Sequence, residues 1–263
     1  MDLVAPTAYI GFPIPSQTTD RILTLVSNLR SGVPEQQGAL YSEVVLALVK
    51  ESLTTFFVNP VKDIGVKPMT EKMVFTGVTT VQKAVGILVN LLSKKLSNAD
   101  MLPATEYLVG LIVQRRRSDE RAAYMVCPLD AELDARLVKV LAEIEAGDAG
   151  TDIESRLTAI VLAINERSLD LFFAKPLEML KLGMVARKTG QVAFEATRVT
   201  TGKVIKKAFN GMENQELRGV MRQIEHMRFD ADEFEPLQTG LKLSAEQLDM
   251  ARKADDIARF GNS

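Results

Sequence analysis

The single histidine and the single cysteine limit the chemistry that this chain of 263 residues can perform by itself. With His226 alone, an HExxH zinc site or a di-iron site built from paired Glu-x-x-His motifs lacks its imidazole ligands. Cys127 precedes Pro128 among apolar residues, whereas a reactive thiol needs an accessible, electropositive setting. Cys127 is therefore predicted to be a buried structural thiol and not a nucleophile activated by His226, and neither a metal nor a cofactor is expected.

Two further patterns resemble ligand sites but lack essential parts. The acidic run from Asp230 to Glu235 resembles the start of a calcium loop, without the central glycine and the distal glutamate. Gly147-x-x-Gly150 precedes a helix as an anion-binding turn would, but no Walker or dinucleotide fingerprint accompanies it. A solvated loop and a plain turn are the favoured interpretations. An enzyme, the third functional hypothesis, would require Asp and Glu residues from separate helices to converge.

The segment from Val185 to Phe209 is predicted to be a basic helix, because it contains six Lys and Arg residues and a single acidic residue, Glu195. Such a helix can bind phosphate, nucleic acid or anionic lipid headgroups. Nucleic acid is not expected, because the chain has no Trp and a net charge of -2. A membrane-surface protein that uses this helix and the apolar amino-terminal arm is the alternative functional hypothesis. The candidate anion-binding residues are Arg187, Lys188, Arg198, Lys203, Lys206 and Lys207.

Two Phe-Phe pairs provide the candidate ligand pocket. Phe56-Phe57-Val58-Asn59-Pro60 recurs as Phe172-Phe173-Ala174-Lys175-Pro176, and a serine precedes each pair by four residues. One interpretation is core packing at corners where proline ends a helix. The other is that both corners meet near a pseudo-two-fold axis and line an apolar cavity with two hydroxyl groups, suited to an acyl chain or another elongated apolar molecule. The candidate pocket residues are Phe56, Phe57, Phe172, Phe173, Ser52 and Ser168.

The Phe-Phe corners belong to a longer internal match, which predicts a duplication. Residues around the corners match at an offset of 116, and an earlier block that includes Pro13 and Pro128 matches at 115. Lys94-Lys95 matches Lys206-Lys207 at 112. Small insertions and deletions in loops are typical of true repeats.

Helical spacing of apolar residues and the absence of sustained alternation predict an all-α fold. We expect two similar four-helix units about a pseudo-two-fold axis, followed by a C-terminal helix from Ser244 to Phe260. The expected organisation is an apolar arm at 1–12, a first repeat at 13–127, a second repeat at 128–229, and an acidic loop with the last helix at 230–263. Helices are predicted at 16–31, 35–57, 70–96, 98–125, 129–146, 151–174, 185–209 and 214–228.

Composition completes the prediction. The single cysteine favours a reducing, cytoplasmic compartment, and no transmembrane segment is predicted, because the most apolar later stretch is short and interrupted by polar residues. The leading hypothesis is a non-enzymatic protein that binds an apolar small molecule or a protein partner. The arm at 1–12 is expected to cover its own bundle or to join a neighbouring subunit in a homo-oligomer.

Overall fold

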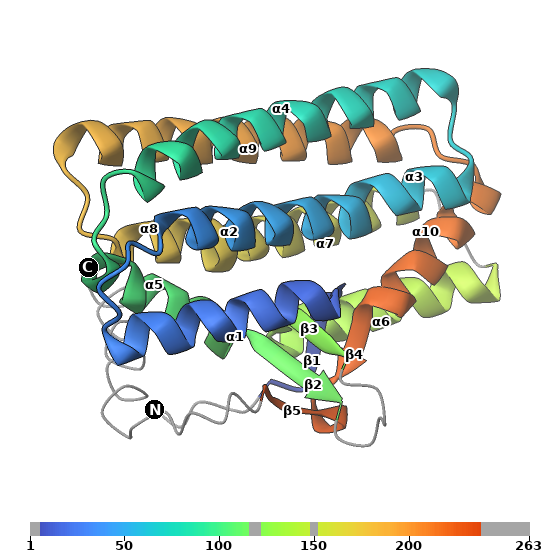
Figure 1. The fold of residues 1–263 in the computed structure, drawn as a ribbon. Helices are drawn as coiled ribbons and strands as arrows, with labels where there is room; N and C mark the ends of the chain where they lie inside the picture. Colours follow the sequence, from blue (N-terminus) through green and yellow to red (C-terminus); the bar gives the residue numbers. More distant parts are fainter. Residues whose placement is uncertain (1–5, 116–121, 148–151, 238–263) are drawn as a thin grey trace, which may run out of the picture.

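Two series of elements follow each other along the chain in the same order (Figure 1). The computed structural model describes residues 6–115, 122–147 and 152–237. The first series comprises β1 (Ala8–Ile14), α1 (Ser16–Ser31), α2 (Gly38–Leu53), the π-helical turn η1 (Thr54–Val58), α3 (Asn59–Ile64), α4 (Pro68–Ser93), α5 (Asn98–Gly110) and β2 (Ile112–Arg115). The second comprises β3 (Ala123–Leu129), α6 (Ala131–Ala146), α7 (Ile153–Leu169), the π-helical turn η2 (Asp170–Ala174), α8 (Lys175–Met179), α9 (Met184–Phe209), α10 (Asn214–Met227) and β4 (Arg228–Asp230). A 3-10 turn, η3 (Ala231–Glu233), and strand β5 (Phe234–Pro236) complete the described chain.

Corresponding elements keep a nearly constant separation in sequence. β1 and β3, like α1 and α6, begin 115 residues apart, and each pair from η1 and η2 onward begins 116 residues apart. The two Lys-Lys pairs, which the sequence analysis matched at an offset of 112, therefore do not occupy corresponding positions. Lys206-Lys207 lies inside α9, whereas Lys94-Lys95 follows the end of α4.

The prediction of an all-α fold is wrong, because the mostly helical chain also forms a five-stranded antiparallel sheet in the order β4-β1-β3-β2-β5. Five of the seven residues are buried in each of β1 and β3. A strand covered on both faces reads as a continuous apolar run and not as an alternation, which is why the period-2 criterion missed it. Residues 8–12, predicted to form an arm, belong to β1, which pairs on one edge with β3 and on the other with β4.

The pairing of β1 with β3 is two-fold symmetric, because the tyrosine of each strand lies opposite the proline of the other. Tyr9 lies opposite Pro128, and Pro13 lies opposite Tyr124. Gly11, at the centre, faces Val126, and a Cβ atom there would lie 2.5 Å from the carbonyl oxygen of Met125. The central strands thus approach too closely for any side chain at position 11.

Most of the predicted helices are confirmed. α1 has the predicted bounds and ends at Gly32, whose φ of 67° is the left-handed conformation that favours glycine at a helix end. α6 ends in the same way at Gly147, and α9 begins one residue before its predicted start. The helix predicted at 98–125 ends instead at Gly110, where β2 follows after one residue. The C-terminal helix predicted from Ser244 to Phe260 lies outside the described residues.

Neither proline of the two Phe-Phe corners ends its helix. The chain passes from α2 through η1 into α3, and from α7 through η2 into α8, without leaving helical backbone angles. In η1 the Asn59 N–H donates to the Thr54 carbonyl, five residues back, and in η2 the Lys175 N–H donates to the Asp170 carbonyl. This wider turn accommodates the ring of the following proline. It also accommodates the loss of one backbone hydrogen bond, because proline has no N–H.

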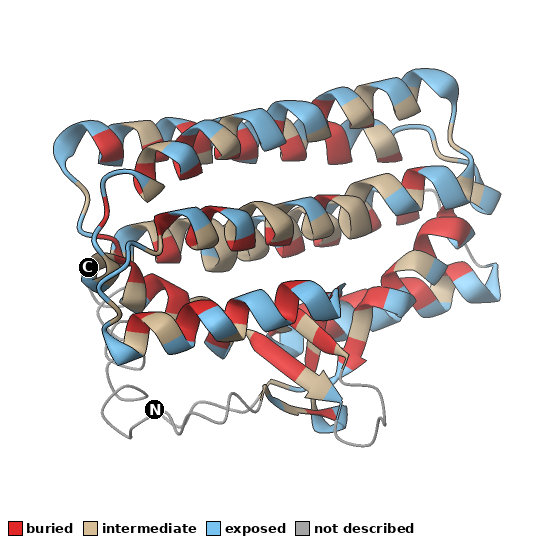
Figure 2. Ribbon diagram, viewed as in Figure 1, coloured by how far each residue is buried: buried red, intermediate tan, exposed pale blue. Residues whose placement is uncertain are grey.

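The helices form layers over the sheet (Figure 1). α4 and α9 lie side by side on the outside, with α2 beneath α4 and α7 beneath α9. A Cβ atom on Gly77 of α4 would lie 2.6 Å from a methyl group of Val204 of α9, so the two outer helices are in close contact. Buried residues line the inner sides of the helices and fill the sheet (Figure 2). The core is therefore continuous from the outer helix pair to the strands.

Candidate functional site

The two Phe-Phe corners approach each other around Phe12 of β1. The ring of this fully buried residue packs edge to face against Phe56, at a centroid distance of 5.8 Å, and against Phe172, at 6.2 Å. Phe173 points elsewhere and packs against Phe194 of α9, at 5.6 Å. The π-helical turns thus place one ring of each pair at the centre of the molecule, where edge-to-face ring pairs stabilise the packing.

An apolar cavity of about 140 Å³ lies beside the first corner. Its wall is formed by β1, η1, α3 and α4 of the first series and by α7, α9 and α10 of the second. Almost all of the wall is hydrocarbon, and the residues that contribute it include Ile10, Phe57, Ile164, Ala208, Phe209 and Ile224. A cavity of this size and polarity can hold a small apolar molecule.

Three of the six predicted pocket residues line this cavity, and three do not. Phe56, Phe57 and Ser168 belong to its wall. Phe172 and Phe173 pack into the core around it, and Ser52 donates its hydroxyl to the Val49 carbonyl at 2.9 Å within its own helix. The sequence therefore located wall residues in both series, Phe56 and Phe57 in η1 and Ser168 in α7, whereas the two phenylalanines of the second corner contribute to packing.

The cavity wall contains three polar side chains. Ser168 lies next to Cys127 and hydrogen-bonds to its thiol. Asn165 donates to the Thr201 hydroxyl at 3.1 Å, and Gln223 donates to a carboxylate oxygen of Asp63 at 3.0 Å. These bonds hold the polar groups at the margin of a hydrocarbon space, where they can orient one polar end of a bound molecule.

Sequence reasoning missed most of the wall, including Ala208, Asn165 and Gln223. A signal was available at Ala208, which corresponds to the larger Leu92 when the offset is 116. The offset of 112 used for this part of the repeat concealed the difference.

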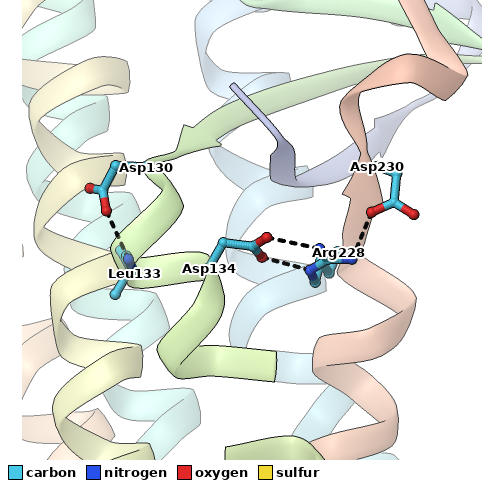
Figure 3. A network of polar contacts seen from close by, with 5 residues as sticks. All are labelled: Asp130, Leu133, Asp134, Arg228 and Asp230. Carbon is cyan, nitrogen blue, oxygen red and sulfur yellow. Dashed lines mark hydrogen bonds and ion pairs between the residues drawn. The ribbon is translucent and has the colours of Figure 1, made fainter. Parts of the chain in front are cut away.

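An ion-pair network fixes the end of α10 beside the cavity (Figure 3). Arg228, which directly follows the cavity residue Met227, donates from Nε and Nη2 to the two carboxylate oxygens of Asp134 at 2.7 and 2.9 Å. It also donates from Nη1 to Asp230 at 2.9 Å. Hydrogen bonding to Asp134 is the main reason that the pKa of Arg228 lies above its usual value. A bidentate pair of this kind joins α6 rigidly to β4.

Asp130, the residue before α6, accepts two hydrogen bonds. One carboxylate oxygen accepts the N–H of Leu133 at 2.8 Å, which caps the helix, and the other accepts from Arg167 of α7 at 3.3 Å. Since Arg167 precedes the cavity residue Ser168, this contact fixes the α7 side of the wall.

Cys127 and His226 do not form a catalytic pair. Burial raises the pKa of the fully buried Cys127 thiol to about 11, so the thiol is protonated at neutral pH. His226 is exposed on α10, with its Nδ1 atom 2.9 Å from the Arg222 carbonyl oxygen. The predicted buried thiol is confirmed.

The acidic run is occupied by contacts within the protein. Asp230 accepts from Arg228, Glu233 lies 3.6 Å from Arg115, and Glu235 accepts from Gln114 at 2.8 Å. These contacts hold β4, η3 and β5 against the sheet. Across residues 6–115, 122–147 and 152–237, no group of three or more His, Cys, Asp or Glu side chains is arranged to hold a metal ion.

All six candidate anion-binding residues are exposed along α9. Arg198 donates to Glu195 at 2.9 and 3.1 Å, one turn away on the same helix. The structure therefore places these cations on the outer helix pair and away from the cavity, so that two separate candidate sites result.

Two helices reach the length and hydropathy of a membrane span. They are Gly38–Ile64 and Pro68–Ser93, with mean hydropathies of 1.4 and 1.3. Both helices meet these criteria by length and composition only, and 22% and 33% of their apolar windows are buried inside the protein.

No family model, no curated protein and no solved structure matches this chain.

Proposed function

We propose that the protein is a non-enzymatic binding protein that takes a compact apolar molecule into the cavity beside η1. The observation that carries this proposal is the apolar space of about 140 Å³ between Phe57, Ile164 and Ala208. An engineered apolar cavity of about 150 Å³ stays dry and binds benzene or xenon. The volume therefore favours a benzene-sized molecule or the end of an acyl chain over a whole elongated lipid.

Internal duplication is part of this proposal. The nearly constant offset of the elements supports it, and so does the correspondence of the buried faces of the two outer helices. Positions 116 residues apart are buried on both helices: Val81 and Thr197, Val85 and Thr201, Leu88 and Val204. A common ancestral unit explains why two different sequences bury the same positions.

In this proposal, divergence between the two copies accounts for the space beside Ala208. At two positions near the cavity the second copy has a small residue where the first copy has a large one. At one position the second copy has the larger residue. The pairs are Phe12 and Cys127, Leu92 and Ala208, and in the reverse sense Ser93 and Phe209. Phe12 and Leu92 are buried and fill the first copy, whereas Ala208 leaves space that neighbouring atoms do not occupy.

Two other hypotheses are weaker. An enzyme would need converging catalytic side chains, and the buried carboxylate of Asp134 is already committed to Arg228. A protein partner remains an alternative to a small molecule, but the hydrocarbon lining of the cavity, which both series of helices contribute, favours the small molecule. The cytoplasmic location stays a prediction from the single cysteine.

Native mass spectrometry of gently purified protein, with xenon-pressurised crystals as its complement, tests the proposal. We expect a mass above that of the polypeptide that disappears on denaturation, or a xenon atom between Phe57 and Ala208. An unliganded mass together with no xenon in the cavity would overturn the proposal, because neither a retained ligand nor a usable space would then exist.

A further inference from the structure

Exposed apolar side chains gather on the outer helix pair. In the part of the chain that the structure describes, seven large hydrophobic residues are strongly exposed, and six of them lie on α4 and α9. Met69 and Met184, each near the first residue of its helix, are both 87% exposed. The other four are Val185, Ile87, Val192 and Val199. Single exposed apolar residues are ordinary, but their concentration on one layer indicates an interaction surface.

The three valines form a stripe along α9. Val185, Val192 and Val199 are spaced by seven residues, which places them on one side of a helix. The opposite side, which includes Ala193, Thr197 and Thr201, is buried. Since α9 packs against α7 and α4, the valine stripe faces away from the protein. Figure 2 shows exposed residues along the outer sides of both helices.

The same layer is strongly basic, although the protein is not. α4 and α9 together carry eight Lys and Arg residues and two Glu residues, a net charge of +6. Because the whole chain carries -2, the residues outside these two helices sum to -8. One of the two acidic residues, Glu195, is hydrogen-bonded to Arg198. The charge is thus separated, with the positive part on the layer that exposes apolar side chains.

We infer that the outer face of α4 and α9 binds an anionic membrane surface. Lysine side chains next to the valine stripe, Lys188, Lys203 and Lys206, can contact lipid phosphates while Val, Ile and Met side chains enter the headgroup region. A second copy of the chain is disfavoured as the occupant, because two faces of charge +6 repel each other. The face lies on the helices and not on residues 8–12, which belong to strand β1 and are paired on both edges.

The magnitude of the effect follows from the charges. A Lys or Arg near an anionic membrane contributes a factor of roughly five in affinity, and the attraction decays within a Debye length. Replacement of Lys188, Lys203 and Lys206 by Gln should therefore weaken binding by about 100-fold at low salt. Replacement of Val185, Val192 and Val199 by Ser should remove the part of the binding that resists added salt.

Vesicle sedimentation tests this inference. Full-length protein is mixed with vesicles of phosphatidylcholine containing roughly 30% phosphatidylserine, and with vesicles of phosphatidylcholine alone, at low and near-physiological salt. The matched control combines Val138→Ser and Lys139→Gln, which remove an exposed valine and an exposed lysine from α6. Circular dichroism verifies that each variant is folded.

We expect binding to the anionic vesicles only. The lysine variant should bind about 100-fold more weakly at low salt, the valine variant should lose binding at near-physiological salt, and the control should not change. Failure of the native protein to sediment with anionic vesicles at low salt would overturn the inference. So would equal binding to neutral vesicles, or a dimer in solution that the valine variant abolishes, since a second copy would then be the occupant.

Discussion

Replacement of Ala208 by Leu tests the cavity from the inside. Ala208 lines the cavity on α9, and the corresponding residue of α4 is Leu92. The substitution adds three carbon atoms to a space that is empty of protein. At about 0.8 kcal/mol for each buried methylene, these atoms contribute up to about 2.4 kcal/mol. The leucine loses about 0.5 to 1 kcal/mol of rotamer entropy, so the variant should be more stable by about 1 to 2 kcal/mol.

The matched control is the same substitution on the same helix. Ala193 is buried on α9 but does not line the cavity, so Ala193→Leu should overpack the core and destabilise the protein by about 1 to 3 kcal/mol. Urea unfolding measures both free energies through the midpoint, provided that the slope of the transition is unchanged. If Ala208→Leu destabilised the protein as much as Ala193→Leu does, the space at Ala208 would not exist and the reasoning would fail.

Three further predictions concern the groups around the cavity and the core. Removing the carboxylate with Asp134→Ala leaves the partly buried Arg228 without its bidentate partner, and urea unfolding should show a loss of about 2 kcal/mol, whereas the exposed Asp232→Ala should change little. Cys127, with its pKa raised to about 11 by burial, should resist Ellman's reagent at pH 8 in the folded protein and react on unfolding; rapid labelling of the native state would contradict this. Burial raises the pKa of Tyr41 to about 12, so the folded state keeps a proton that the unfolded state releases near pH 10. The contribution of Tyr41 to the free energy of unfolding is therefore complete below pH 10 and falls by about 2 to 3 kcal/mol between pH 10 and 12. Tyr41→Phe should flatten this decline, and the same pH dependence of stability in the native protein and the variant would contradict the prediction.

The helices could be predicted from the sequence because their signals are local. α1 and α6 each have an apolar stripe and a glycine in the left-handed conformation at the end, and these signals need no tertiary information. The strands could not be predicted in the same way. β1 and β3 are buried on both faces and each contains a proline, so neither alternation nor β-propensity marks them.

The two prolines were misleading for a related reason. Proline usually ends a helix, but Pro60 and Pro176 follow π-helical turns that absorb the missing N–H. A π-helical turn is rare enough that no sequence rule favours it over a helix end. Its recurrence at two places 116 residues apart would nevertheless be expected if one ancestral unit already contained it.

The candidate site was half visible in the sequence. Phe56, Phe57 and Ser168 were identified by the recurrence, because the Phe pair and the preceding serine stand out at both corners. The remaining wall depends on the small side chain of Ala208, at a place where α4 has Leu92, and on how the neighbouring helices pack around it. Side-chain volume in a packed core is a tertiary property, and single-sequence patterns do not report it.

Calorimetric titration with benzene tests the central claim most directly. Benzene matches the volume of the cavity and needs no hydrogen bond, so its binding reports the apolar space itself. We predict saturable binding of one benzene molecule to the native protein and none to Ala208→Leu, whose added carbons occupy the same space. An absence of saturable binding to the native protein, or equal binding to both proteins, would contradict a ligand site at this cavity.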